Sequence, residues 1–157
     1  MPECQYCILH YFASVLILFG ILTTAWAVNW KADFNRHQKG LVKTCIGNKC
    51  VPHLDDPDIY NLISLGFYLS LLCDLLVTLH CLLKGSLPNA FAKILVEVVF
   101  WTSIIGAVVL IAGCGWFGFE NFGNQLFPGY SFGLVFTGAL ILISAGTATS
   151  REQPPHA

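Results

Sequence analysis

The chain has 157 residues, of which 55% are hydrophobic and 11% are charged, and its net charge is −1. Soluble globular proteins carry about 25% charged residues, so a chain this poor in charge could not cover a water-exposed surface. The near-neutral balance gives no basic field that would recruit nucleic acid. Composition therefore predicts an integral membrane protein, and the length fits one domain over residues 1–157.

Four long apolar stretches predict membrane-spanning helices. A span needs about 20 mostly apolar residues to cross a hydrocarbon core of about 30 Å. Any other backbone conformation would leave N–H and C=O groups unpaired in lipid, so we expect helices. They cover residues 8–28, 59–83, 90–114 and 130–148. The predicted fold class is an all-α membrane protein, a four-transmembrane-helix bundle.

Three connections join these stretches. Residues 29–58 form a long polar loop, residues 84–89 form a short turn with Gly85 and Pro88 as helix breakers, and residues 115–129 form a loop rich in Gly and Phe. An even number of crossings places both termini on the same side of the membrane.

The first apolar stretch has a second interpretation, as a cleaved signal peptide. Ala25-Trp26-Ala27 resembles the small-x-small pattern that signal peptidase cleaves. No Lys or Arg precedes the apolar run, and the run is long, which favours a retained helix. Cleavage would leave the rest of the topology unchanged.

The side of the membrane on which the long loop lies is ambiguous from charge alone. The loop holds five Lys or Arg residues and the opposite side holds three, which would place the loop in the cytoplasm. Cys45 and Cys50 in the same loop indicate the opposite orientation, because a disulfide between them needs an oxidising compartment.

The long loop also carries a motif. Trp30 follows the first span, Gly40-Leu41 follows after nine residues, and Cys45 and Cys50 have four residues between them. This pattern resembles the claudin superfamily, which includes the peripheral myelin and epithelial membrane proteins. Its signature is a Trp outside the first helix, then Gly-Leu-Trp, then two cysteines.

The resemblance is that of a divergent member. Val42 stands where the family has its second Trp, and the close cysteine spacing is similar to that of the epithelial membrane protein branch. Gly129-Tyr130-Ser131-Phe132 resembles a segment of the same branch, whereas residues 40–52 resemble modulator-of-smoothened proteins. The chain has no Asn-x-Ser/Thr acceptor, although that branch often carries one in this loop.

The resemblance implies cytoplasmic termini, a plasma-membrane location and an extracellular first loop that forms a small β-hairpin or sheet. Gly47-Asn48 is a good tight-turn pair, and a hairpin there would place Cys45 opposite Cys50 at disulfide range. Two free thiols, or a zinc site with His37 and His53, are the alternatives. The spacing of these four residues matches no zinc-finger pattern.

Asp74 and Glu97 are acidic residues within predicted spans, where a charge costs about 2.5–3.5 kcal/mol on insertion scales. Both fall in the cytoplasmic half of the predicted topology, so they could meet, and Lys93 is placed to pair with Glu97 on one helix face. A proton or cation relay is one interpretation. A structural polar contact is favoured, because broken helices and repeated halves of transporters are not visible. Its possible partners are Thr78, His80 and Ser103.

The remaining cysteines are predicted to have separate roles. Cys4, Cys7 and Cys81 lie near the cytoplasmic ends of the first two spans, which makes them candidates for palmitoylation. Cys73 and Cys114 are expected to be packed or lipid-facing apolar residues.

The sequence shows no nucleophile–base pair, phosphate loop or metal cluster, so we predict a non-enzymatic protein with no cofactor and no metal. The leading hypothesis is a claudin-like protein that organises cell contacts or membrane partners. Its partners would be the lipid bilayer and other membrane proteins, either a second copy or a different protein. One alternative is an accessory subunit or trafficking regulator of a channel or receptor. Another is a proton-coupled carrier that uses Asp74 and Glu97.

Overall fold

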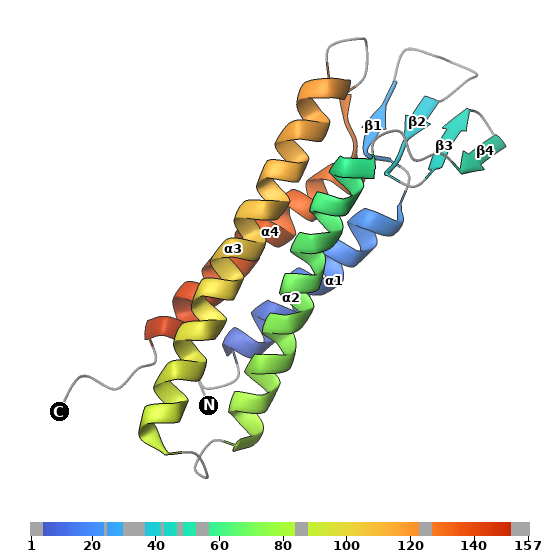
Figure 1. The fold of residues 1–157 in the computed structure, drawn as a ribbon. Coiled ribbons are helices and arrows are strands. Elements are labelled where there is room, and N and C mark those ends of the chain that lie inside the picture. The colour runs from blue at the N-terminus through green and yellow to red at the C-terminus, as the bar shows by residue number, and fades with distance from the viewer. Residues whose placement is uncertain are drawn as a thin grey trace.

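The computed structural model describes residues 5–23, 25–29, 37–41, 43–46, 49–52, 57–83, 88–122 and 127–151. Within these ranges the chain forms four helices and five short strands (Figure 1). The helices are α1 (Gln5–Leu22), α2 (Pro57–Leu83), α3 (Asn89–Asn121) and α4 (Tyr130–Arg151). The strands are β1 (Ala27–Val28), β2 (His37–Lys39), β3 (Lys43–Ile46), β4 (Lys49–Pro52) and β5 (Phe127–Pro128).

The helices form an elongated bundle with the sheet at one end (Figure 1). Helix α1 packs mainly on α4, α2 packs on α3, and α3 packs on α4, whereas the contact between α1 and α2 is less extensive. Helix α1 begins and α4 ends at the end of the bundle far from the sheet. The mainly helical fold and the small sheet contributed by the first loop are therefore as predicted.

Three of the helices, α2, α3 and α4, are long and apolar enough to cross a membrane. Helix α1 is also apolar but has only 18 residues, a length of about 27 Å at about 1.5 Å per residue. Large apolar side chains are exposed on every helix. They include Phe12, Phe19, Leu65, Tyr68, Ile105 and Leu140. So much exposed apolar surface is consistent with an integral membrane protein.

The predicted end of the first helix is wrong. The helix ends at Leu22, where the Thr23 hydroxyl donates a hydrogen bond to the Phe19 carbonyl at 2.7 Å. The chain then enters the sheet, because the Trp26 N–H donates to the Lys39 carbonyl at 3.1 Å and Ala27 pairs with Lys39 in β2. Hydropathy missed this end because the strand residues are as apolar as a helix.

The predicted loop over residues 115–129 is also partly wrong, because α3 continues to Asn121. The extra turns keep helical hydrogen bonding, and they bury Phe117 and Asn121 at the sheet end of the bundle. The Phe122 N–H closes the helix by donating to the Gly118 carbonyl at 2.8 Å. Tertiary burial of Phe117 outweighs the low helix propensity of the glycines in this segment.

Candidate functional site: the loop sheet and the cavity beneath it

The sheet is antiparallel with strand order β4-β3-β2-β1-β5. Four strands lie in the connection between α1 and α2, and β5 lies in the connection between α3 and α4. The sequence predicted a small hairpin or sheet within residues 29–58, which hold β2, β3 and β4. It gave no sign of β1, which was assigned to the first span, or of β5, because Phe127-Pro128 has no strand periodicity. The sheet thereby joins the two connections that lie at the same end of the bundle (Figure 1).

Cys45 and Cys50 lie opposite each other in the β3–β4 hairpin and are at disulfide distance, with an S–S separation of 2.05 Å and a Cα–Cα separation of 4.0 Å. The predicted pairing is therefore confirmed. A disulfide leaves neither thiolate available to zinc, so this geometry does not support the zinc alternative. His53 lies outside the described residues.

Gly40 and Leu41, two residues of the family motif, form the turn between β2 and β3. The Gly40 N–H donates to the Lys43 carbonyl at 3.0 Å. Leu41 is buried and packs in the core formed at this end of the bundle. Trp30 and Val42 lie outside the described residues.

Trp26 is buried where the sheet packs on the helical bundle, and the sequence did not predict this role for it. Its side chain is fully buried, and its indole N–H donates to the Gly20 carbonyl at 2.7 Å. Its ring packs edge-on against Phe117 at 5.1 Å and Phe132 at 6.1 Å between centroids. The small residues beside it, taken above as a cleavage pattern, are both buried and leave room for this packing.

The Gly129-Tyr130-Ser131 segment fastens α4 to the end of α1. The Gly129 N–H donates to the Trp26 carbonyl at 2.8 Å, and the Ser131 N–H donates to the Ala25 carbonyl at 3.1 Å. The Ser131 hydroxyl accepts from the Ala25 N–H at 3.0 Å. This part of the resemblance therefore has a physical role, since it couples the fourth helix to the sheet.

One face of the β3–β4 hairpin is apolar and exposed. Thr44 lies opposite Val51 and Ile46 lies opposite Lys49, so these four side chains share one face of the sheet. They line a hollow of about 500 Å³. Ile46 is 56% exposed and Val51 is 62% exposed, although both are strongly apolar. Strand β4 is also an edge strand of the sheet, which leaves its outer backbone edge open to pairing.

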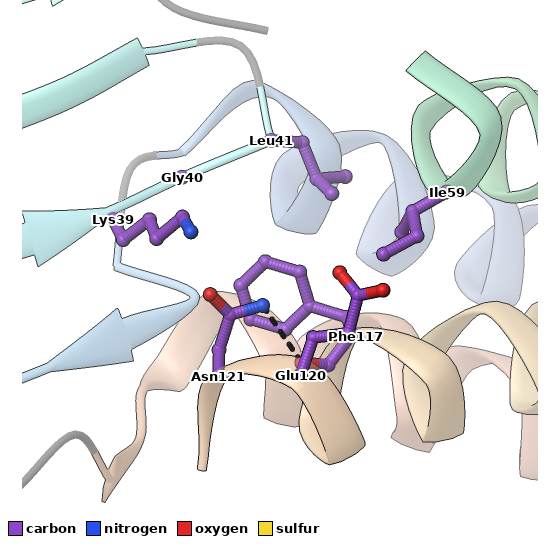
Figure 2. Close-up of a pocket in the computed structure, with 7 residues that line it drawn as sticks. All are labelled: Lys39, Gly40, Leu41, Ile59, Phe117, Glu120 and Asn121. Atoms are coloured by element: carbon purple, nitrogen blue, oxygen red, sulfur yellow. Dashed lines mark hydrogen bonds between the residues drawn. The ribbon is translucent and has the colours of Figure 1, made fainter. Parts of the chain in front are cut away.

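A second cavity, of about 310 Å³, lies between the sheet and the ends of α2 and α3. Figure 2 shows its lining, with the Lys39 side chain entering from β2 and the Glu120 carboxylate from α3. The other lining residues are Gly40, Leu41, Ile59, Phe117 and Asn121. The cavity thus holds two opposite charges, and its exposed lining is mostly polar.

Hydrogen bonds within α3 position the polar groups of this cavity. The Trp116 indole N–H donates to Glu120 Oε1 at 2.8 Å, and Asn121 Nδ2 donates to the Phe117 carbonyl at 2.9 Å (Figure 2). Partial burial lowers the pKa of Lys39, and the nearby Glu120 carboxylate acts in the opposite direction by stabilising the ammonium. The two charges therefore act on each other across the cavity.

The two acidic residues of the predicted spans lie in different environments. Asp74 is buried and its carboxylate faces Ser14 of α1, whereas Glu97 is exposed on α3. The structure does not bring the two carboxylates together on one buried face. Ser14 Oγ and Asp74 Oδ1 are buried with no hydrogen-bond partner among the described residues. This geometry does not supply the paired acids that the carrier hypothesis needs.

Two of the predicted hydrogen-bond partners of the Asp74 carboxylate, Thr78 and Ser103, donate their hydroxyl groups to backbone carbonyls instead. The Thr78 hydroxyl donates to the backbone carbonyl of Asp74 at 2.6 Å and also hydrogen bonds to Tyr11 of α1. The Ser103 hydroxyl donates to the Val99 carbonyl at 2.7 Å, and its oxygen lies 3.5 Å from the sulfur of Cys73.

His10 is a further polar residue that the sequence argument missed. Its side chain is fully buried, and neither ring nitrogen has a hydrogen-bond partner among the described residues. A histidine inside an apolar stretch was the available signal. Thr149 and Ser70 are also buried, but their hydroxyls donate to backbone carbonyls one turn earlier in their own helices.

Two of the candidate palmitoylation sites contact each other. Cys7 of α1 and Cys81 of α2 have their sulfur atoms 2.9 Å apart, and Cys7 is only 7% exposed. Such burial leaves Cys7 poorly placed for acylation in this conformation, while Cys81 is half-buried. Cys4 lies outside the described residues, and acylation of all three stays a prediction. Cys73 and Cys114 are buried in the bundle.

No protein-family model and no curated protein matches this chain. The resemblance to the claudin superfamily therefore rests on the residues quoted above.

Proposed function

We propose that the protein is a non-enzymatic, claudin-like organiser of cell contacts, and that it uses the exposed apolar face of the β3–β4 hairpin to bind a second copy on a neighbouring cell. The observation that carries the proposal is this face: two strongly exposed apolar side chains, Ile46 and Val51, on a disulfide-closed hairpin at the tip of the molecule. Exposed apolar groups on rigid scaffolds are typical of protein interaction sites.

The membrane arrangement that belongs to this proposal has four crossings, with α1 as the shortest. A length of about 27 Å for α1 is close to the hydrocarbon thickness of about 30 Å. The disulfide in the sheet supports an extracellular position for the loop, since such bonds persist in oxidising compartments. The proposal gives the protein cytoplasmic termini and a location in the plasma membrane.

The partner is a second copy because the hairpin offers two complementary features to an identical surface. The open edge of β4 provides backbone donors and acceptors for antiparallel pairing, which is compatible with two-fold symmetry. The apolar hollow beside this edge supplies surface that pairing would bury. Pro52 at the end of β4 limits the length of such pairing.

The test is cell aggregation in suspension, using cells that do not adhere to one another and that express the full chain. We expect the wild type to enrich at contacts and to aggregate cells, and the Ile46→Glu/Val51→Glu variant to lose both effects. Lys43→Glu is the matched control because Lys43 is exposed on the same strand but projects to the other face of the sheet. Surface biotinylation checks that all variants reach the plasma membrane in equal amounts.

Diffuse wild-type protein with normal surface levels would overturn the adhesive function. An equal loss in the Lys43→Glu variant would overturn the role of the apolar face. An accessory-subunit function predicts a different result, namely one stoichiometric partner crosslinked within the same membrane and no change in aggregation.

A further inference from the structure

We propose that the cavity between the sheet and the ends of α2 and α3 binds the headgroup of a zwitterionic phospholipid, with Lys39 contacting the phosphate and Glu120 contacting the quaternary or primary ammonium. This site is separate from the apolar hairpin face, and its occupancy does not depend on cell adhesion.

The charge pattern of the cavity selects a zwitterion. Lys39 and Glu120 come from different elements, β2 and α3, and both side chains line the cavity (Figure 2). A purely anionic ligand would be repelled by the carboxylate, and a purely cationic ligand by the ammonium. A group with separated opposite charges is attracted by both.

The wall of the cavity beside Glu120 leaves recognition of the cationic end of such a headgroup to the carboxylate, because the apolar residues there are almost fully buried. Phe117 and Ile59 line the cavity beside Glu120. The hydrogen bond from Trp116 holds the Glu120 carboxylate in place before a ligand arrives.

The position of the cavity along the bundle favours a membrane lipid as the source. Helix α3 has 33 residues, or about 50 Å, so it exceeds the hydrocarbon core of about 30 Å and must project beyond it. Glu120 and Asn121 are its last residues, and the exposed Trp116 marks the interfacial level one turn earlier. The cavity therefore lies at the height of the headgroups.

The size of the cavity matches a headgroup and excludes whole lipid chains. A volume of about 310 Å³ is at the lower limit of ligand pockets, which range from about 300 to 1,000 Å³. The acyl chains would remain in the bilayer along the apolar surfaces of α2 and α3. The exposed side chains of these two helices include Leu65, Tyr68, Val108 and Ile105.

The experiment measures binding of short-chain lipids to the purified full chain in maltoside micelles by isothermal titration calorimetry. The probes are dihexanoylphosphatidylcholine, dihexanoylphosphatidylglycerol and free phosphocholine. We expect the zwitterionic lipid to bind at least about tenfold more tightly than the anionic lipid, because only the former satisfies Glu120. The free headgroup should bind more weakly than the lipid, since it lacks the chains.

The variants are Glu120→Gln and Lys39→Gln, with Glu97→Gln and Lys93→Gln as exposed controls for the same changes of charge. Gln at position 120 keeps an acceptor for the Trp116 N–H, so the fold should persist. Retention of the Cys45–Cys50 disulfide verifies that each variant is folded.

We expect both cavity variants to weaken binding of dihexanoylphosphatidylcholine by about tenfold, and both controls to bind as the wild type does. Equal affinity of the wild type for the zwitterionic and anionic lipids would overturn the proposal, and so would wild-type affinity in folded Glu120→Gln. Free phosphocholine binding as tightly as the lipid would overturn the assignment to a membrane lipid.

Discussion

Replacement of Gly129 by Ala tests the joint between α4 and the end of α1. A Cβ atom at this position would lie 1.9 Å from the Ala25 carbonyl oxygen and 2.7 Å from its carbon. Real Cβ atoms essentially never come within 3.0 Å of another heavy atom, so the backbone must separate by about 1 Å or more. The neighbour is backbone rather than a flexible side chain, and no rotamer change can relieve the clash.

The expected cost follows from the contacts that this separation disturbs. Overpacking of a close contact costs about 1–3 kcal/mol. Two backbone hydrogen bonds at the joint, Gly129 N–H to Trp26 and Ser131 N–H to Ala25, are weakened as well, at about 0.5–1.5 kcal/mol each. We therefore expect the free energy of unfolding to fall by about 2–6 kcal/mol, which corresponds to a melting temperature about 4–24 °C lower for a chain of this size.

The assay is thermal unfolding of the purified protein in detergent, followed by tryptophan fluorescence, which reports on the buried Trp26. Gly133→Ala is the matched control, because a Cβ there meets nothing within 4 Å and Ala is favoured over Gly in a helix by up to about 1 kcal/mol. The control should melt at or above the wild-type temperature. A Gly129→Ala variant that melts within about 2 °C of the wild type would refute the steric argument.

Three further predictions concern the cysteines and the buried acid. Cys45 and Cys50 should react with maleimide only after reduction, and labelling without reductant would contradict the pairing. Reduction should also lower the free energy of unfolding by about 2 kcal/mol, the value for a small disulfide-closed loop. Diamide, which accepts two electrons and two protons, should convert Cys7 and Cys81 to a disulfide, so that both lose the maleimide labelling seen when the untreated protein is unfolded before labelling. Cys7→Ser should leave Cys81 reactive, and independent loss of labelling at the two cysteines would contradict their contact. Asp74→Asn should leave the melting temperature unchanged or raise it. The reason is that the mutation removes a buried carboxylate whose Oδ1 has no hydrogen-bond partner among the described residues. A clear fall in melting temperature would indicate a favourable charge interaction at this position.

The predicted and observed elements agree best where hydropathy or local residue spacing alone decides the conformation. Hydropathy located the apolar helices because lipid leaves the backbone no alternative to internal hydrogen bonding. Helix α2 therefore begins within two residues of its predicted start, and α4 begins at the predicted Tyr130. The spacing of Cys45 and Cys50 around a tight-turn pair likewise predicts the hairpin, because a tight turn depends only on residues that are neighbours in the sequence.

Hydropathy predicts the wrong element where apolar residues form something other than a membrane span. Ala27-Val28 has the composition of a helix end, but it forms a strand because β2 and β5 lie on either side of it. Phe117 falls in a segment rich in glycine, which predicts a loop, yet its packing on Trp26 extends α3. In both cases the deciding partner is distant in the sequence.

By itself the sequence determined that the chain has the charge-poor composition of an integral membrane protein, four long apolar segments and a cysteine pair spaced for a hairpin in the first loop. Charge depletion and local spacing carry that information. Only the tertiary structure decided what surrounds each polar group. It placed Asp74 against Ser14 and left Glu97 exposed, it brought Cys7 to Cys81, and it set Lys39 and Glu120 across one cavity. These outcomes depend on the rotation of each helix about its axis and on the strand that joins the two loops, and both are fixed by side-chain packing rather than by hydropathy.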